Sequence, residues 1–490
     1  MLEITAFICG AVVMIFETTG SRVLGPYFGT SIIIWTGLIG IILGSLSFGY
    51  YLGGKIADKK PDYQILSLVI FLSAISIGIM ILIKDFLLII LQLNFDDIKI
   101  PSLLASLILF SPASILLGMV SPYTVKLKMQ NLNTSGATVG NLYAISTAGS
   151  IVGTFLSGFY LIPLFGTNKI LVILMLVLIL NSLIIFFKQL SKKIISLLII
   201  LFIWFLADGF TYAFEKKGVI DLDTAYNRIW IYDHIDIKTN KPVKIMGINN
   251  ENHSSMFLDS DELVNEYTKY YDLAKHFNPN FKKTLMFGGA GYSYPKYFLN
   301  KYPESTMDVV EIDKKITDLA KKYFGLKENL NLNIYHEDGR VYLNKTKKKY
   351  DVIFGDAFTS VYSIPYQLTT FEAIKRKYEI LNDNGLVVLN IISAIDGEKS
   401  KFLKAEYATY KNIFPQVYLF PVNTLKDTKE TQNIILVALK SKEIPSFKNG
   451  DPILNNYLDH LWREEIVTDI PILTDDFAPV DYYMSSNLKN

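Results

Sequence analysis

Long apolar runs fill the first 214 residues of this chain and limit its fold more than any other feature. A helix needs about 20 consecutive apolar residues to cross the core of a bilayer. The runs predict a multi-pass α-helical membrane domain with about seven spans, at Ile4–Phe16, Ser31–Gly53, Tyr63–Ile83, Leu103–Tyr123, Val139–Phe165, Ile170–Phe187 and Ile194–Phe214. The run Phe86–Leu93 is too short to span, and we expect an interfacial or partly re-entrant piece there.

The composition changes after residue 214, which predicts a domain boundary. Lys, Asp, Glu, Asn and Tyr become frequent, and 490 residues exceed one ordinary core. We predict a transmembrane domain at 1–214, a linker and small β-rich segment at 215–260, and an α/β domain at 261–490. Within the β-rich segment, Arg228–His234 alternates as an edge strand would, and Val243–Ile248 is its candidate partner.

Two stretches of the apolar half, 14–54 and 116–163, resemble each other. Each has a short span, a polar and basic connector that contains a proline, and a span rich in Gly and Ser. Because each unit would hold three spans, the repeat would be inverted, an arrangement common in transporters. The alternative is an ordinary bundle in which small residues only permit close helix packing.

Charge, cysteine and histidine usage exclude several classes of protein. A net charge of +2 argues against binding to nucleic acid through bulk electrostatics. The single cysteine, Cys9, cannot form a disulfide or a cysteine metal site within one chain. The five histidines are scattered, with no pair at helical ligand spacing. We therefore expect neither a nucleic-acid partner nor a metal.

A glycine loop follows a predicted strand in the C-terminal half. In KKTLMFGGAGYS, the glycines at 288, 289 and 291 let the backbone approach a ligand, and the loop amides would face it. Further strands are predicted in TMDVVEIDKKITDLAKKYF, which continues as a helix, in LNIYHEDGRVYLNK, with its end at Asp338–Gly339, in YDVIFGDAF, with its end at Asp356, and in GLVVLNIIS. Their alternation with helical stretches is typical of an open parallel α/β sheet.

One acid falls at the end of each of the next three predicted strands: Glu311, Asp338 and Asp356. Ligands bind at the carboxyl ends of the strands in open α/β sheets, and a carboxylate after the second strand can bind both ribose hydroxyls. The dinucleotide fingerprint G-x-G-x-x-G and a P-loop lysine are both absent. The order predicts a Rossmann-like domain of the S-adenosylmethionine type, although each acid alone could equally cap a helix or lie on the surface.

Sidedness gives two conflicting indications. Lysines cluster after the second, fourth and sixth predicted spans, so the positive-inside rule places these loops in the cytoplasm. Seven spans would then leave the C-terminal domain outside, whereas a nucleotide ligand requires the cytoplasm. We predict a multi-pass protein of the cell membrane with a cytoplasmic C-terminal domain.

Glu17 and Arg22 fall at the predicted edge of the first span, where an ionisable residue is a functional candidate.

These segments together resemble the spermidine synthase (polyamine aminopropyltransferase) family, and in particular its membrane-fused members. In the apolar half the matching segments are ETTGSRVLGPYFGTS, WTGLIGIILGSLSFGYYLGGKIADKK and NLYAISTAGSIVGTFLSGFYLIPLFG. In the C-terminal half they are AYNRIWIYD, DELVNEYTKYYDLA, LMFGGAGYSYPKYF, VVEID, EDGR, GDAFTSVYSIPYQLTTFEAI and LTDDFAPVDYY. The order and spacing of these segments are specific to the family.

The resemblance implies a donor site and a substrate pocket. Glu311 would hold the ribose hydroxyls, Asp338 the adenine amino group, and Asp356 would accept the proton of the acceptor amine as the catalytic residue. The implied donor site comprises Asn227, which replaces a glutamine, Gly288, Gly289, Gly291, Glu311, Asp313, Asp338 and Gly339. The implied substrate pocket comprises Tyr267, Tyr271, His253 and Tyr366.

The implied activity moves the propylamine group of decarboxylated S-adenosylmethionine to an amine and releases methylthioadenosine, without a metal. The implied partners are the lipid bilayer, a small amine acceptor and a second copy of the chain in a dimer. The glycine loop lacks the family's aspartate, and Thr359 stands where the family has a second acid. The acceptor, and whether the donor is decarboxylated, therefore stay open. Two alternatives also remain: a membrane transporter with a nucleotide- or polyamine-sensing domain, and an S-adenosylmethionine-dependent methyltransferase.

Overall fold

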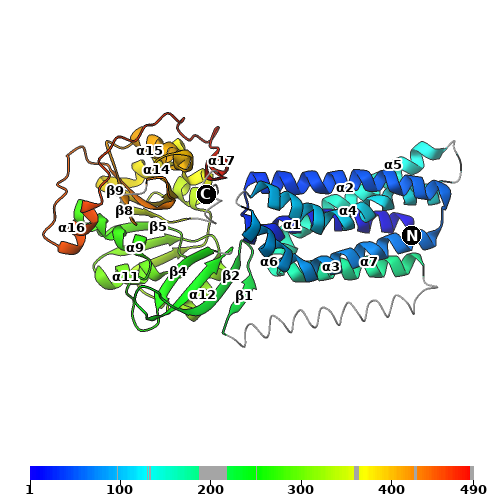
Figure 1. Ribbon diagram of the computed structural model, residues 1–490, viewed down its shortest axis with the longest axis horizontal. Coiled ribbons are helices and arrows are strands. Elements are labelled where there is room, and N and C mark those ends of the chain that lie inside the picture. Colours follow the sequence, from blue (N-terminus) through cyan, green and yellow to red (C-terminus); the bar gives the residue numbers. More distant parts are fainter. Residues whose placement is uncertain are drawn as a thin grey trace. The chain divides into compact units, whose positions relative to one another are not determined.

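The computed structural model describes residues 1–95, 98–129, 131, 134–186, 218–249, 251–357, 364–423 and 428–485. The chain forms two compact units, Met1–Ile229 and Trp230–Asn490. The first is helical, and the second is built around a mixed sheet (Figure 1).

Six helical stretches in the described residues are long and apolar enough to cross a membrane. They are α1 (Leu2–Phe28), α2 (Ile32–Lys59), α3 (Tyr63–Asn94), α4 (Lys99–Lys128), α7 (Thr167–Ile185), and α5 (Ser135–Leu156) continued through a π-helical turn (Ser157–Leu161) into α6 (Ile162–Leu164). The predicted seventh span, Ile194–Phe214, lies outside the described residues.

Two predicted boundaries in this unit are wrong. The first span was expected to end at Phe16, but α1 continues through Glu17 and Arg22 to Phe28. The Thr18 hydroxyl donates to the carbonyl of Met14, so a polar side chain is satisfied within the helix instead of ending it. The run Phe86–Leu93 is no separate piece either, because it forms the last turns of α3.

Three helix pairs have the most extensive contacts, namely α2 with α4, α1 with α5, and α3 with α7, and α3 also packs on α4. Glycines allow the first two pairs to approach closely. A Cβ on Gly49 or Gly53 of α2 would collide with the backbone of α4, and one on Gly149 or Gly153 of α5 would collide with the backbone of α1. The two interfaces therefore use the same four-residue glycine spacing.

Residues 220–229 belong to the helical unit, whereas the sequence predicted its end at residue 214. Polar contacts explain this difference. Arg22 on α1 donates to the carbonyls of Thr224 and Tyr226, and Arg228 forms an ion pair with Asp85 of α3. These contacts are not local in the sequence, so composition alone could not place the boundary.

A four-stranded sheet follows, in the order β1-β2-β3-β4. Its strands are β1 (Ile220–Asp223), β2 (Arg228–Ile235), β3 (Pro242–Ile248) and β4 (Glu251–Phe257). The predicted pairing of Arg228–His234 with Val243–Ile248 is confirmed. The prediction that the former is an edge strand is wrong, because the short β1, which carries little hydrophobic signal, pairs with its outer side.

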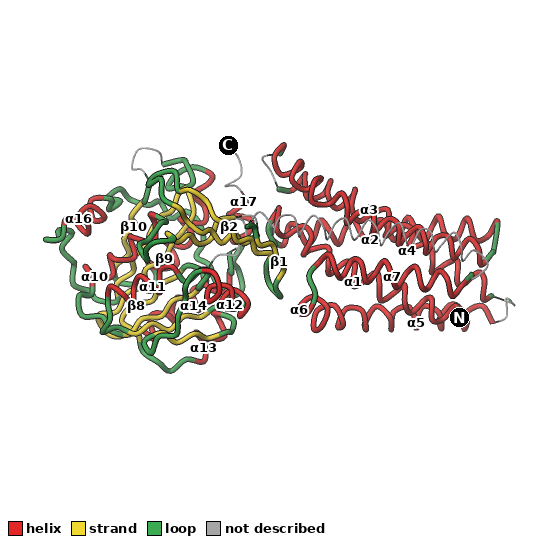
Figure 2. Tube along the Cα trace, turned by 90° about the horizontal axis from the view of Figure 1, so that it is seen from below, coloured by secondary structure: helices red, strands yellow, loops and turns green. Residues whose placement is uncertain are grey.

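The larger sheet has seven strands in the order β10-β11-β9-β8-β5-β6-β7. Its strands are β5 (Lys283–Phe287), β6 (Thr306–Val310), β7 (Leu332–Tyr335), β8 (Tyr350–Gly355), β9 (Leu381–Ser393), β10 (Gln416–Pro421) and β11 (Gln432–Leu439). Strands β5 to β9 are parallel, and β11 is antiparallel to both of its neighbours. The predicted Rossmann-like sheet is present, with strands between helices (Figure 2).

Helices cover this sheet, and its inner strands are almost continuously buried, as expected of a parallel sheet between helical layers. The helices are α9 (Glu266–Lys269), α10 (Leu273–Phe277), α11 (Ser293–Lys301), α12 (Lys314–Tyr323), α13 (Gly339–Lys345), α14 (Phe371–Ile380), α15 (Lys401–Lys411), α16 (Pro452–Asp459) and α17 (Val480–Ser485). Buried side chains of α13, α14 and α15 share one core with β5, β8 and β9. Elsewhere Tyr271, Tyr294 and Phe298 form an aromatic cluster with Phe354 of β8.

Candidate active site

The candidate site lies where the strand order reverses. Strand β5 pairs with both β6 and β8, so the connections after β5 and β8 leave the sheet in opposite directions. Such a switch point opens a crevice at the carboxyl ends of the strands. Gly288 follows β5 and Asp356 follows β8 directly. The amide of Asp356 donates to the carbonyl of Phe287 at 3.0 Å, which fixes the two ends side by side.

A pocket of about 360 Å³ occupies this crevice. Its lining brings together five of the predicted site residues: His253, Tyr267, Gly288, Gly289 and Asp356. The lining also includes Glu251, Asn252, Ser254, Ser255, Asn265, Ala290, Ser293, Tyr294, Asn390 and Asn433. Many of these groups are polar and neutral, as in a site that orients a ligand through hydrogen bonds.

Asp356 has two hydrogen-bond donors, one for each carboxylate oxygen. The Tyr267 hydroxyl donates to Oδ2 at 3.1 Å, and Asn390 Nδ2 donates to Oδ1 at 3.2 Å. Burial raises the pKa of Asp356 to about 6, although the neighbouring side chains of Asn390, Tyr271 and Tyr267 oppose this shift. A carboxylate with such a pKa can accept and release a proton near neutral pH.

Two further groups near Asp356 are buried. Burial lowers the pKa of His253 to about 4, so this imidazole is neutral at physiological pH. Its Nε2 atom is buried and has no hydrogen-bond partner among the described residues. Tyr271 packs edge-on against Tyr267, and burial raises the pKa of both phenols well above their usual value.

Glu311, at the end of β6, holds the glycine loop. Its Oε2 accepts from the amides of Gly289 at 2.9 Å and Ala290 at 3.4 Å, while Oε1 accepts from the amide of Asp313 at 2.9 Å. Glu311 is 7% exposed and does not line the pocket. The carboxylate therefore lies one loop behind the pocket lining, and its predicted contact with ribose hydroxyls stays a prediction.

Asp313 and Asp338 are helix caps in this structure. Asp313 accepts from the amide of Lys315 at the start of α12, and Asp338 accepts from the amides of Arg340 and Val341 at the start of α13. The second oxygen of Asp338 accepts a long hydrogen bond, 3.5 Å, from Gln367. Capping explains both acids locally, so a ligand contact has to use the remaining lone pairs.

The remaining predicted residues have different surroundings. A Cβ on Gly291 would lie 2.6 Å from Ser254 Oγ, so this glycine lets β4 approach the loop. Gly339 faces Phe287 and Leu368, and Tyr366 is 53% exposed and not in the pocket lining. Asn227 belongs to the helical unit, where its carbonyl accepts from Thr224.

Asn390 and Asn433 were not predicted from the sequence. Asn390 interrupts the apolar run LVVLNIIS of β9, and Asn433 follows Gln432 at the start of β11. A polar side chain in a central strand needs a partner, so the interruption was the signal that could have identified Asn390, whereas Asn433 carries no such signal.

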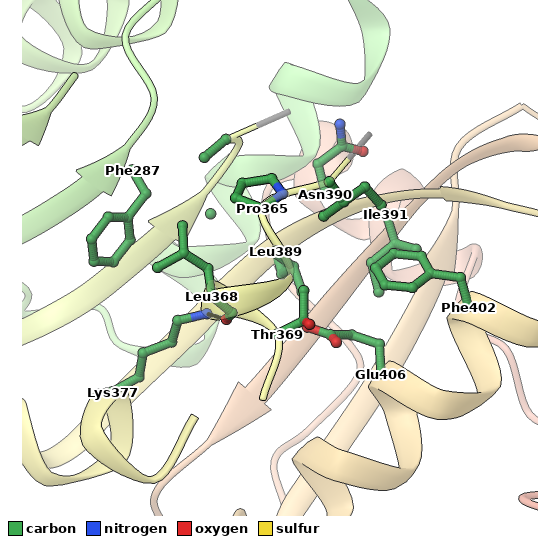
Figure 3. A pocket seen from close by; sticks show the side chains of 13 residues that line it. Phe287, Pro365, Leu368, Thr369, Lys377, Leu389, Asn390, Ile391, Phe402 and Glu406 are labelled. Atoms are coloured by element: carbon green, nitrogen blue, oxygen red, sulfur yellow. Dashed lines mark hydrogen bonds between the residues drawn. The ribbon is translucent and has the colours of Figure 1, made fainter. Parts of the chain in front are cut away.

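A second, smaller cavity of about 40 Å³ is lined in part by Ile364, Pro365, Leu368 and Thr369 (Figure 3). Asn390 lines both cavities. Lys377 of α14 and Glu406 of α15 extend toward each other inside it, and Lys377 donates to the carbonyl of Leu368 at 3.0 Å. Burial lowers the pKa of Lys377 and raises that of Glu406. Lys377 therefore ties α14 to the segment Ile364–Thr369.

Among the described residues, no group of three His, Cys, Asp or Glu side chains is arranged to hold a metal ion.

The comparisons identify the C-terminal part of the chain. Residues 267–446 match the family described as spermine/spermidine synthase domain. This part of the chain therefore carries a spermidine synthase domain. A polyamine aminopropyltransferase of Vibrio vulnificus (strain CMCP6) is 36% identical over 166 residues, 33% of this chain and 52% of that protein. A probable polyamine aminopropyl transferase of Bifidobacterium longum (strain NCC 2705) is 30% identical over 239 residues, 43% of this chain and 52% of that protein.

The chain thus spans about half the length of these curated relatives. Among solved structures, a probable spermidine synthase from Corynebacterium glutamicum ATCC 13032 is similar, with 24% identity and a TM-score of 0.40. That similarity covers 45% of this chain and 80% of the other. The synthase domain contains Asp356 and the glycine loop, whereas His253 and the helical unit lie outside the matched residues.

Proposed function

We propose that this protein is a membrane-bound aminopropyltransferase that uses decarboxylated S-adenosylmethionine and an amine acceptor. The observation that carries the proposal is Asp356, a carboxylate with a pKa of about 6, which lines a pocket beside the glycine loop at the switch point of a spermidine synthase domain. The donor would lie along the loop, with its reacting carbon toward Asp356.

The charges of the pocket support a decarboxylated donor. Glu251 and Asp356 are the acids of the described lining, which contains no Lys or Arg. S-adenosylmethionine itself carries a carboxylate, and such a group placed beside Asp356 without a cationic partner is disfavoured. A sulfonium with a propylamine tail has only positive charges, which this pocket favours. The same argument makes the methyltransferase alternative less compatible with the site.

The proposed chemistry needs alignment and one proton acceptor. The neutral amine nitrogen of the acceptor attacks the propyl carbon next to the sulfonium, the carbon–sulfur bond breaks, and methylthioadenosine leaves. Asp356 accepts the proton from the attacking amine. Tyr267 and Asn390 keep the carboxylate in one orientation, and holding both reactants in one pocket supplies a large part of the rate enhancement.

Donor preference tests this proposal. The detergent-purified protein is titrated calorimetrically with decarboxylated S-adenosylmethionine and with S-adenosylmethionine. We expect the decarboxylated donor to bind at least about tenfold more tightly, because one unpaired buried carboxylate costs more than about 1.4 kcal/mol. Tighter binding of S-adenosylmethionine would reject the decarboxylated donor.

Activity should depend on pH through Asp356. Because the base must be ionised, kcat/KM is expected to be low below the pKa of about 6 and to rise to a plateau above it. The measurement is kcat/KM for the amine between about pH 5 and 8. A profile that is flat across this range would exclude Asp356 as the titrating base.

Removal of the Tyr267 hydroxyl should move this profile. In Tyr267→Phe, Oδ2 of Asp356 loses its donor, which destabilises the charged form and raises the pKa of Asp356 by about one unit. The activity is then expected to fall about fivefold at pH 6 and less than twofold at pH 8. Tyr270→Phe is the matched control, since the Tyr270 hydroxyl contacts His460 and not Asp356. Equal profiles for the two variants would contradict the assigned contact.

The helical unit supports a second candidate function, transport of a cationic substrate or product. If α1–α3 and α4–α7 are the two halves of an inverted repeat, α1 corresponds to α4, α2 to α5, and α3 to α7. The α1–α5 interface then corresponds to the α4–α2 interface, and the α3–α7 pair corresponds to itself. The glycine pairs at 49/53 and 149/153 occupy equivalent places in these interfaces. We therefore propose that the predicted inverted repeat exists and that the unit is embedded in the bilayer, with the synthase domain on the cytoplasmic side.

Uptake into proteoliposomes tests the second candidate. The full chain and Asp356→Asn are reconstituted and assayed with radiolabelled amines, the classes of compound that the synthase domain would use. Uptake by both forms would support transport that is independent of transfer. No uptake by either form would limit the helical unit to anchoring.

A further inference from the structure

Two asparagines connect Asp356 to the neighbouring strands of the sheet. Asn433 Nδ2, on β11, donates to Asn390 Oδ1 at 3.0 Å, and Asn390 Nδ2, on β9, donates to Asp356 Oδ1 at 3.2 Å. The chain of hydrogen bonds therefore runs from β11 across β9 to the residue that follows β8. Asn390 is 2% exposed, so solvent does not compete for its amide group.

The direction of the chain matters because an amide has one accepting and one donating end. Asn390 could present either its NH₂ group or its oxygen to Asp356. The NH₂ group of Asn433 occupies the oxygen of Asn390, and this leaves the Asn390 NH₂ group facing the carboxylate. The opposite orientation would place an oxygen against the carboxylate, and an acceptor there disfavours the ionised form.

We propose that Asn433 and Asn390 are positioning residues that select the ionised, correctly rotated form of the Asp356 carboxylate. This inference rests on the proposed function of Asp356 as the proton acceptor. Asn433 acts only through Asn390. Because Tyr267 donates to the other oxygen, each oxygen keeps a lone pair, and the carboxylate can receive the proton without losing either donor.

Both asparagines also line the pocket, so substrate contact is the competing explanation for any loss of activity. The two explanations differ in the pH profile. Loss of a substrate contact raises KM at every pH. Loss of a donor to Asp356 makes ionisation harder and moves the acid limb of kcat/KM to higher pH.

The test is a cycle of three variants: Asn433→Ala, Asn390→Ala and the double variant. Asn390→Ala should move the acid limb up by about one pH unit and lower kcat/KM at pH 6 about fivefold. Asn433→Ala should move it in the same direction by less, since Asn390 can then adopt both orientations. The double variant should match Asn390→Ala, because Asn433 has no effect without its intermediary. Shifts that add, or an unmoved limb in Asn390→Ala, would overturn the proposal.

A second measurement does not depend on turnover. The melting temperature of wild type is compared with that of Asp356→Asn across about pH 4–8. Because burial raises the pKa of Asp356 above its unfolded value, the folded state binds more protons in this interval, and wild type loses stability relative to Asp356→Asn as the pH rises to about 6. In an Asn390→Ala background, this loss should continue to higher pH.

The two measurements separate the two claims. If the melting profile moves in Asn390→Ala but no donor is turned over, the positioning chain stands and the proposed transferase function fails. If turnover is present but neither the acid limb nor the melting profile moves, the transferase stands and the positioning role is rejected. Lower stability at all pH values, without a change in either profile, shows a packing role only.

Discussion

Asp356→Asn is expected to lower kcat/KM for amine transfer by about 10²–10⁴-fold, with a smaller loss of affinity for the cationic donor, which no longer meets the charge of Asp356. The side chains have the same shape, and an amide can still accept the hydrogen bond from Asn390. It cannot, however, accept a proton from the attacking amine. The measurement is steady-state transfer, with donor affinity from calorimetry on the same preparation.

Asp351→Asn is the matched control for this variant. Asp351 lies at the opposite end of β8, where it accepts from the amides of Lys282 and Lys283. Its replacement should lower stability through these contacts and leave kcat/KM within about threefold, since the residue is remote from the reacting atoms. If Asp356→Asn keeps the activity of this control, a different group accepts the proton.

Gly288→Val is expected to disrupt the site from the backbone. Gly288 has a φ of 90°, and a Cβ would collide with the carbonyl oxygen of Asp356 and lie 3.0 Å from its carbonyl carbon. A β-branched residue is strained at positive φ, and backbone atoms cannot rotate away as a side chain would. Strain and overpacking together cost on the order of 3 kcal/mol. For a unit of this size, the melting temperature should fall by roughly 6–12 °C.

Gly450→Ala serves as the control in the same unit. A Cβ at Gly450 meets nothing within 4 Å. The melting temperature should therefore change by no more than about 2 °C. If Gly288→Val melts within this range and still binds the donor, the close approach of the loop to Asp356 is not required.

The local signals in the sequence predicted strands β5 to β9 and the polar residues that follow them, but not strands β10 and β11 or the antiparallel pairing of β11. The glycines after β5 and the acids after β6, β7 and β8 each mark the end of a strand. Each of these signals can be recognised from a few neighbouring residues. Asp356 and the glycine loop meet in the pocket because β5 and β8 are adjacent and parallel. The strand order places β5 and β8 side by side at the switch point. Alternation of strands and helices along the chain strongly restricts the strand orders that an α/β sheet can adopt.

Features that depend on distant contacts were not predictable in the same way. Residues 224–228 contact α1 and α3 through the hydrogen bond of Arg22 to Thr224 and the ion pair of Arg228 with Asp85. These partners are some 140–200 residues apart in the sequence. The pairing of Asn390 with Asn433 requires the antiparallel register of β9 and β11. Asp338 shows the limit of the strand-end rule: β7 ends at Tyr335, three residues earlier, and Asp338 caps α13 through its carboxylate.

The identity of the product formed from the donor tests the central claim most directly. Purified full-length protein is incubated with decarboxylated S-adenosylmethionine or S-adenosylmethionine and with a panel of amines, and the nucleoside products are resolved by mass spectrometry. We expect methylthioadenosine from the decarboxylated donor, formed together with an acceptor that has gained one aminopropyl group, and neither product with Asp356→Asn. Formation of S-adenosylhomocysteine, or binding of both donors without any turnover, would contradict an aminopropyltransferase.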